Sequence, residues 1–183
     1  MSPTSRDRVR SWITRESLDG FAQFENIVRE IGSVADGALL FFQGRVRRTN
    51  RGRAVSRLSY EAYGEMAERE LSDICREALE RFDVGSVAAA HRVGDLALGE
   101  VSVAIAVTSE HRDAGYRASR WIIETIKVRL PVWKHEHYED GDSHWVGAPI
   151  PDAGTLTGGT SPPLAASGPE GGELPAQPPL SVP

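Results

Sequence analysis

The spacing of apolar residues along the chain changes several times, and each change marks an expected element. Residues 9–13 predict a short strand. Residues 17–31 follow with a period of about 3.6 and predict a helix, whose buried side would hold Phe24, Ile27, Val28 and Ile31. Gly32 and the Asp36-Gly37 pair end this helix.

The middle of the chain alternates strands and helices. Residues 38–46 begin apolar on both faces, as in a buried strand, and the arginine-rich loop RVRRTNRGR separates them from an expected strand over 54–62. A helix is expected over 66–82. Residues 87–93 and 101–108 predict an antiparallel strand pair, with 94–99 as the turn between them.

The third helix and the strands after it have the sharpest boundaries. Ser109 is an expected N-cap, and the helix over 112–130 would bury Ala118, Ile122, Ile126 and Leu130. Pro131 ends the helix because its ring removes a backbone donor. A strand over 132–138 and a turn over 139–142 follow, and 144–146 can return beside that strand.

This order of elements predicts an α+β fold with a mainly antiparallel sheet and three main helices, because no regular βαβ repeat is present. Residues 151–183 contain eight of the eleven prolines, six glycines and no Lys or Arg. Such a segment buries too little apolar surface to offset its ordering entropy. We therefore expect one domain over 1–150 and a disordered Pro/Gly-rich tail over 151–183.

Composition narrows the class of protein. No apolar run approaches the length of a membrane span, and the polar start MSPTSRDRVR has no signal-peptide core, so we expect a cytoplasmic protein without membrane contact. The net charge of -5 gives no whole-chain field for nucleic acid. The single cysteine, Cys75, excludes an internal disulfide and falls among apolar residues at helical spacing, which favours a buried structural thiol over a nucleophile.

The two lysines are the first candidate chemistry. Lys127 and Lys134 both lie in the stretch IKVRLPVWKHE, whereas the other nineteen basic residues are arginines. Arg cannot release its proton in a protein, but Lys can when it is desolvated. If the chain reverses at Pro131, both ammonium groups can reach one pocket, where crowding and partial burial favour the neutral amine. A solvated pair of surface lysines is the alternative.

Two further segments offer basic residues for an anion. Ser109-Glu110-His111-Arg112 joins a buried strand to a helix start, where free N–H groups favour a phosphate or carboxylate. Alternatively, Arg112 pairs with Glu110 or Asp113 and His111 is a surface residue. The loop from Arg45 to Arg53, with Arg47 inside it, suits RNA or a nucleotide as well as a phosphorylated metabolite, although no aromatic residues interleave its arginines.

Metal binding has weaker support. His135 and His137 would share one face of a strand, opposite Glu136, and His144 lies across the turn. The chain has no HExxH or CxxC motif, so ordinary polar residues of an edge strand are the better interpretation.

Four ordered stretches, "FFQGRVRRTNRG", "HRVGDLALGE", "VTSEHRDAGYRASRWIIETIKVRLPVWKHE" and "HWV", resemble the catalytic (large) subunit of molybdopterin synthase. The resemblance covers about residues 37–146. It implies an α/β hammerhead fold, and a homodimer that forms a heterotetramer with two small sulfur-carrier subunits. It further implies sulfur transfer from the carrier's C-terminal Gly-Gly thiocarboxylate to cyclic pyranopterin monophosphate (precursor Z), without a bound cofactor or metal.

The resemblance also assigns residues to this activity. It places the family's catalytic lysine on Lys127 and its second active-site lysine on Lys134. The substrate-binding residues would include these two lysines together with Arg45, Arg47, His111, Arg112 and Glu136. Two departures stand out: His135 occupies a position that is commonly Lys or Arg, and Gly147-Ala148-Pro149 replaces a segment that is often charged.

Overall fold

The structure is a computed structural model, and it describes residues 8–147. Backbone contacts divide the chain into two compact units, Met1–Ile150 and Pro151–Pro183. The predicted disordered tail over 151–183 and the Gly147-Ala148-Pro149 departure lie wholly or largely outside the described residues, so they stay predictions. No helix within residues 8–147 is long and apolar enough to cross a membrane.

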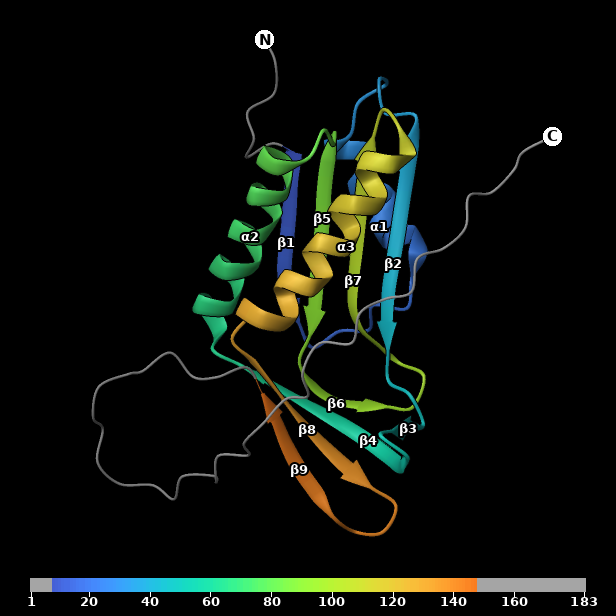
Figure 1. The fold of residues 1–183 in the computed structure, drawn as a ribbon, viewed down its shortest axis with the longest axis vertical. Coiled ribbons are helices and arrows are strands. Elements are labelled where there is room, and N and C mark those ends of the chain that lie inside the picture. Colours follow the sequence, from blue (N-terminus) through green and yellow to red (C-terminus); the bar gives the residue numbers. More distant parts are fainter. Residues whose placement is uncertain (1–7, 148–183) are drawn as a thin grey trace, which may run out of the picture. The chain divides into compact units, whose positions relative to one another are not determined.

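One four-stranded sheet forms the centre of the first unit (Figure 1). Its strand order is β1 (Val9–Thr14), β5 (Ser86–Arg92), β7 (Val101–Ser109) and β2 (Ala38–Arg45). β1 pairs with β5 in parallel, and the other pairs are antiparallel. Every residue of β7 is buried, because helices cover both faces of this sheet.

Three helices cover the sheet, as Figure 1 shows: α2 (Gly64–Arg81) and α3 (Arg112–Arg129) lie on one face and α1 (Phe21–Ile31) on the other. Successive residues of a strand point to opposite faces, so each central strand contributes to two cores. Ile105 packs in the core beneath α2 and α3, whereas Ala104 and Ala106 pack with Phe24 beneath α1. The buried row predicted for the third helix, Ala118, Ile122, Ile126 and Leu130, is confirmed.

A second sheet is drawn below the first in Figure 1, and its strands alternate along the chain with those of the first sheet. Its order is β3 (Thr49–Asn50), β4 (Arg53–Ala62), β8 (Val132–Tyr138) and β9 (Ser143–Gly147), and β6 (Gly94–Ala97) also pairs with β4. All of these pairs are antiparallel. The predicted α+β class with a mainly antiparallel sheet and three helices is therefore confirmed.

The structure corrects three local predictions. The first helix begins at Phe21 rather than residue 17, because the Ser17 hydroxyl bonds Asp19 in a local turn and Gly20 precedes the helix. The predicted turn over 94–99 contains β6, which β4 stabilises by pairing. Ser109 does not cap α3: it ends β7, its hydroxyl donates to the His111 carbonyl oxygen, and His111 is the N-cap.

Candidate functional site

A pocket of about 800 Å³ lies where the end of α3 meets the second sheet. Its walls come from separate elements, including β2, β4, β8 and α3. Five of the predicted site residues line it: Arg45, Arg47, Lys127, Lys134 and Glu136. The chain around Pro131 thus brings the two lysines to one pocket, where Lys127 is exposed and Lys134 is partly buried.

The two lysines have different surroundings. Lys127 lies in the last turn of α3 and is exposed at the pocket. Lys134 lies on β8, its side chain is 28% exposed, and its Nζ is 2.6 Å from Glu136 Oε1. Within residues 8–147, Lys134 forms an ion pair with a carboxylate and Lys127 does not. Lys127 therefore presents the less restrained ammonium group.

Glu136 is the most enclosed charged residue of the pocket, with 1% of its surface exposed. Burial by itself raises the pKa of its carboxyl, but hydrogen bonds from Lys134, Tyr138 and Asn50 outweigh burial and hold that pKa below its ordinary value. Tyr138 shows the matching effect, because its hydroxyl donates to the Glu136 carboxylate and its own pKa is raised. Glu136 is therefore a buried carboxylate that binds the Lys134 ammonium, the Asn50 amide and the Tyr138 hydroxyl.

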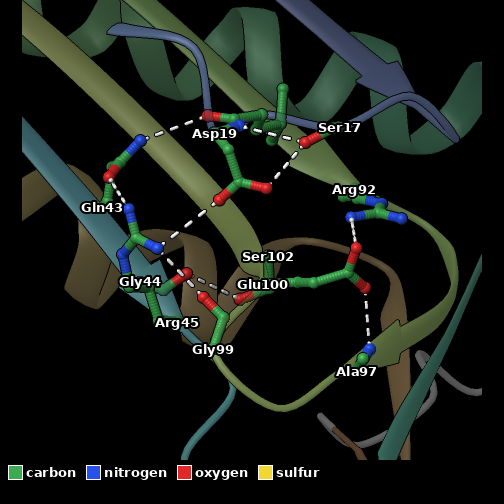
Figure 2. A network of polar contacts seen from close by, with 11 residues as sticks. Ser17, Asp19, Gln43, Gly44, Arg45, Arg92, Ala97, Gly99, Glu100 and Ser102 are labelled. Atoms are coloured by element: carbon green, nitrogen blue, oxygen red, sulfur yellow. Dashed lines mark hydrogen bonds and ion pairs between the residues drawn. The ribbon is translucent and has the colours of Figure 1, made fainter.

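Arg45 enters the pocket wall but is held by its own chain, as Figure 2 shows. Its guanidinium donates to the Gln43 side-chain oxygen at 2.8 Å and to the Gly99 carbonyl oxygen at 3.0 Å. It also lies 3.5 Å from Asp19. Arg47, two residues further, is exposed at the pocket. Arg45 thus has a fixed orientation, whereas Arg47 is the more accessible cation.

His111 and Arg112 lie at the opposite end of α3 and do not line the pocket. Arg112 and Lys127 are fifteen positions apart, which is about 22 Å along a helix. Glu110 lies 3.6 Å from His111, and Asp113 pairs with Arg117. Within residues 8–147, Arg112 forms an ion pair with neither Glu110 nor Asp113. One copy of the chain does not bring this corner to the lysines.

The sequence interpretation missed neutral polar residues in the pocket wall: Asn50, Tyr60, His91 and Ser102. His91 is 7% exposed, and its Nδ1 lies 2.9 Å from the Arg92 carbonyl oxygen. Burial lowers the pKa of its imidazole to about 4, so the ring is neutral at physiological pH. A histidine that directly follows the apolar run VAAA in β5 is the signal that points to this position.

The remaining histidines and the cysteine have structural surroundings. His135 and His137 share a face, as expected, and His135 stacks on Trp145 with ring centroids 4.4 Å apart. Residues 8–147 contain no group of three or more His, Cys, Asp or Glu side chains arranged for a metal ion. Cys75 is fully buried, and burial raises the pKa of its thiol to about 12, which confirms a structural thiol.

Together, the fold and the pocket define an α+β protein with a pocket lined by two arginines and two lysines. The chain belongs to the MoaE protein family, whose model matches residues 13–129. That segment includes Arg45, Arg47, His111, Arg112 and Lys127, and it ends before β8.

Individual relatives agree with this membership. The chain is 43% identical over 123 residues to the molybdopterin synthase catalytic subunit of Bacillus subtilis (strain 168), covering 67% of this chain and 78% of the relative. A molybdopterin synthase structure from Staphylococcus aureus matches with a TM-score of 0.66 at 38% identity, over 74% of this chain and 95% of that chain. A complex of subunits 1 and 2 of molybdopterin-converting factor from Helicobacter pylori 26695 shares the fold, with a TM-score of 0.61 at 19% identity over 80% and 97% of the chains.

Proposed function

We propose that the basic pocket transfers sulfur to precursor Z and so forms the dithiolene of molybdopterin. Family membership and the curated relatives make the chain a molybdopterin synthase catalytic subunit, a sulfurtransferase of molybdenum cofactor biosynthesis. One observation carries the assignment of the site: the only two lysines of the chain line one pocket. This function is favoured over an RNA-binding role for the Arg45 to Arg53 loop, in which Arg45 is already held by internal contacts.

The charges of the pocket suit a cyclic phosphate. Lys127, Lys134 and Arg47 supply three cations, and Glu136 fixes one of them in place. The sulfur reaches the substrate as the carrier's thiocarboxylate, and water cleaves the resulting thioester so that the carrier leaves as a carboxylate. As the sulfur bonds to a side-chain carbon of the substrate, the C–O bond at that carbon breaks and negative charge develops on the departing oxygen. The ammonium of Lys127 can stabilise that charge or donate a proton to it, and both roles need an N–H group close to the reacting atom. Lys127 and Lys134 are thus the proposed catalytic lysines.

The sulfur has to come from outside the chain, because Cys75 is its only thiol and is buried. We propose as donor a small carrier subunit whose C-terminal Gly-Gly carries a thiocarboxylate. The related structure from Helicobacter pylori is described as a complex of two subunits, which supports a two-component enzyme. The extended tail of the carrier would enter the pocket from its open side.

His111 and Arg112 fit this proposal only if a second copy contributes them. The length of α3 separates them from the lysines of their own chain by about 22 Å. We therefore propose a homodimer with a carrier on each copy, a heterotetramer, in which the helix start of one copy completes the phosphate site of the other. Free N–H groups at that helix start and the Arg112 guanidinium would bind the phosphate.

Reconstitution tests the function directly. The purified chain is mixed with thiocarboxylated carrier and precursor Z, and molybdopterin formation is measured. We expect product only when all three components are present. Activity that needs no carrier, or no product in the complete mixture, would contradict the proposal.

Complementation tests the shared site. Lys127→Ala and Arg112→Ala chains are each expected to be nearly inactive alone. Mixed dimers should regain activity, because one of the two sites then contains both intact residues. If mixed dimers form but stay inactive, His111 and Arg112 do not serve the partner's pocket.

A further inference from the structure

Both oxygens of the Glu136 carboxylate accept a hydrogen bond from Asn50, a residue outside the strand that carries Glu136. The Asn50 side-chain amide donates to Oε1 at 2.8 Å and to Oε2 at 2.7 Å. The Tyr138 hydroxyl also donates to Oε2, and Lys134 Nζ contacts Oε1. Each oxygen therefore has two partners, and rotation of the carboxylate would break several hydrogen bonds at once.

Local backbone geometry places Asn50 at this position. Asn50 ends β3, and it is joined to Arg53 at the start of β4 by the two-residue turn Arg51-Gly52. Both turn residues have positive φ, 47° and 81°, as in the tight hairpin turns that suit strand twist. β4 then pairs with β8, which carries Lys134 and Glu136 on one face. The short hairpin thus brings an amide against a buried carboxylate 86 residues away.

The chemistry of an amide suits this position. Asn50 contributes two N–H donors without adding charge, so Glu136 keeps its negative charge for Lys134. Because Glu136 is buried, the loss of these donors would leave carboxylate lone pairs unsatisfied away from water. A carboxylate freed in this way can turn, and the ammonium bound to it moves with it.

We propose that Asn50 is a positioning residue that acts through Glu136 to fix the Lys134 ammonium in the pocket. Tyr138 supports the same carboxylate from β8. The effect on turnover rests on the proposed function, but the effect on Lys134 is a property of the folded chain and can be measured without substrate.

Nuclear magnetic resonance tests the positioning itself, because a chain with two lysines gives only two sets of lysine side-chain signals. With lysine-labelled protein, Lys127→Arg and Lys134→Arg identify the two signals. We expect Asn50→Ala to lower the heteronuclear NOE of the Lys134 side chain toward the value of Lys127, and to leave Lys127 unchanged. Asn26→Ala, at an exposed site on α1, is the matched control and should change neither signal.

Activity of the same variants tests the consequence in the reconstituted system. Asn50→Ala should lower kcat/KM about tenfold to a hundredfold, the scale expected when a reacting group is misplaced. Asn50→Asp keeps the size but places a second carboxylate beside Glu136, so the two share a proton only at lower pH. Its activity relative to wild type should therefore rise on acidification, by up to about tenfold per pH unit, whereas that of Asn50→Ala should not.

Separate results overturn separate claims. Wild-type Lys134 dynamics in a folded Asn50→Ala chain would exclude the positioning role. Loosened Lys134 with unchanged kcat/KM would show that the position of Lys134 does not limit turnover, which also overturns the proposal for the pocket. Failure of wild-type reconstitution contradicts the proposed function alone, because the dynamics measurement needs no substrate. Should Asn50→Ala fail to fold, Tyr138→Phe removes one donor from the same carboxylate and should loosen Lys134 to a smaller degree.

Discussion

The two sheets of this chain differ in what they bury, and the pocket lies where they meet. In the helix-covered sheet, every residue of β7 is buried, and two apolar cores enclose a few buried polar side chains such as His91 and Thr108. In the second sheet, β8 buries Glu136 and surrounds it with polar partners. The first sheet is stabilised mainly by apolar burial, whereas part of the second depends on satisfied hydrogen bonds.

Each region contributes one lysine, and the lysines differ as their surroundings do. Lys127 ends a helix that packs on the first sheet, and it has no carboxylate partner within residues 8–147. Lys134 belongs to the second sheet and is held by Glu136. Under the proposed function, Lys127 would approach the reacting atom, while Lys134 would provide a charge at a fixed position.

The largest expected effect separates the two lysines directly. Lys127→Arg keeps the charge but loses the compact ammonium, and it should lower turnover of precursor Z by about 10²–10⁴-fold, the usual contribution of acid-base catalysis. Lys134→Arg should cost only about tenfold, because a guanidinium can still pair with Glu136. Single-turnover product formation with saturating carrier measures both. Equal losses would remove the distinction between a mobile and a fixed lysine.

Core truncation compares how the two sheets are stabilised. Ile122 of α3 is fully buried against the first sheet, and Ile122→Ala should destabilise the fold by about 2–5 kcal/mol. Trp145 of β9 is 48% exposed and stacks on His135, so Trp145→Ala should cost about 0.2–1 kcal/mol. Urea unfolding of both variants gives the two values. A larger loss for Trp145→Ala would mean that the Trp145–His135 stack stabilises the fold more than the buried contacts of Ile122 do.

The pH dependence of stability tests the neutral, buried His91 of the first sheet. The folded protein keeps the His91 imidazole neutral down to pH about 4, whereas the unfolded chain takes up a proton near pH 6.5. Stability is therefore lost as pH falls from 6.5 to 4, by about 3 kcal/mol from this group. His91→Gln should lack that loss in unfolding measured across the same pH range. Identical pH profiles would show that His91 is not desolvated in the folded state.

A small effect is also expected at Cys75, on the buried face of α2. Cys75→Ala removes one buried heavy atom and should cost about 1 kcal/mol without lowering activity. Ellman's reagent should label the thiol only after unfolding, because the side chain is fully buried. Rapid labelling of the native protein would show that the Cys75 thiol is accessible. Loss of sulfur transfer in the variant would show that Cys75 takes part in the reaction.

Much of the fold could be predicted from local patterns. The predicted 112–130 helix and 132–138 strand match Arg112–Arg129 and Val132–Tyr138, because Pro131 marks the boundary between them. β3 and β6 were not predicted, since each is a short strand defined by its pairing with β4 rather than by its own sequence. A pattern within one strand carries no information about the partner strand.

The candidate site divides in the same way. Arg45, Arg47, Lys127, Lys134 and Glu136 were predicted and line one pocket. His111 and Arg112 belong to the same sequence motif as Lys127, but a rigid helix places them at its other end. Asn50 carries no signal in its arginine-rich loop, because its role depends on a contact with a residue 86 positions later. Residues that act through long-range contacts can be recognised only once the fold is known.

The parallel pairing of β1 with β5 has a consequence for biosynthesis. Val9 pairs with Val87, so the first strand has to wait for 78 further residues before its neighbour exists. At about 5–20 residues per second, a ribosome needs roughly 4–16 s for that interval. β8 emerges later still, so the pocket cannot close around Lys134 until nearly all of the described chain has been made. Nascent chains should therefore spend seconds with β1 unpaired and with its apolar residues Val9, Trp12 and Ile13 exposed to solvent.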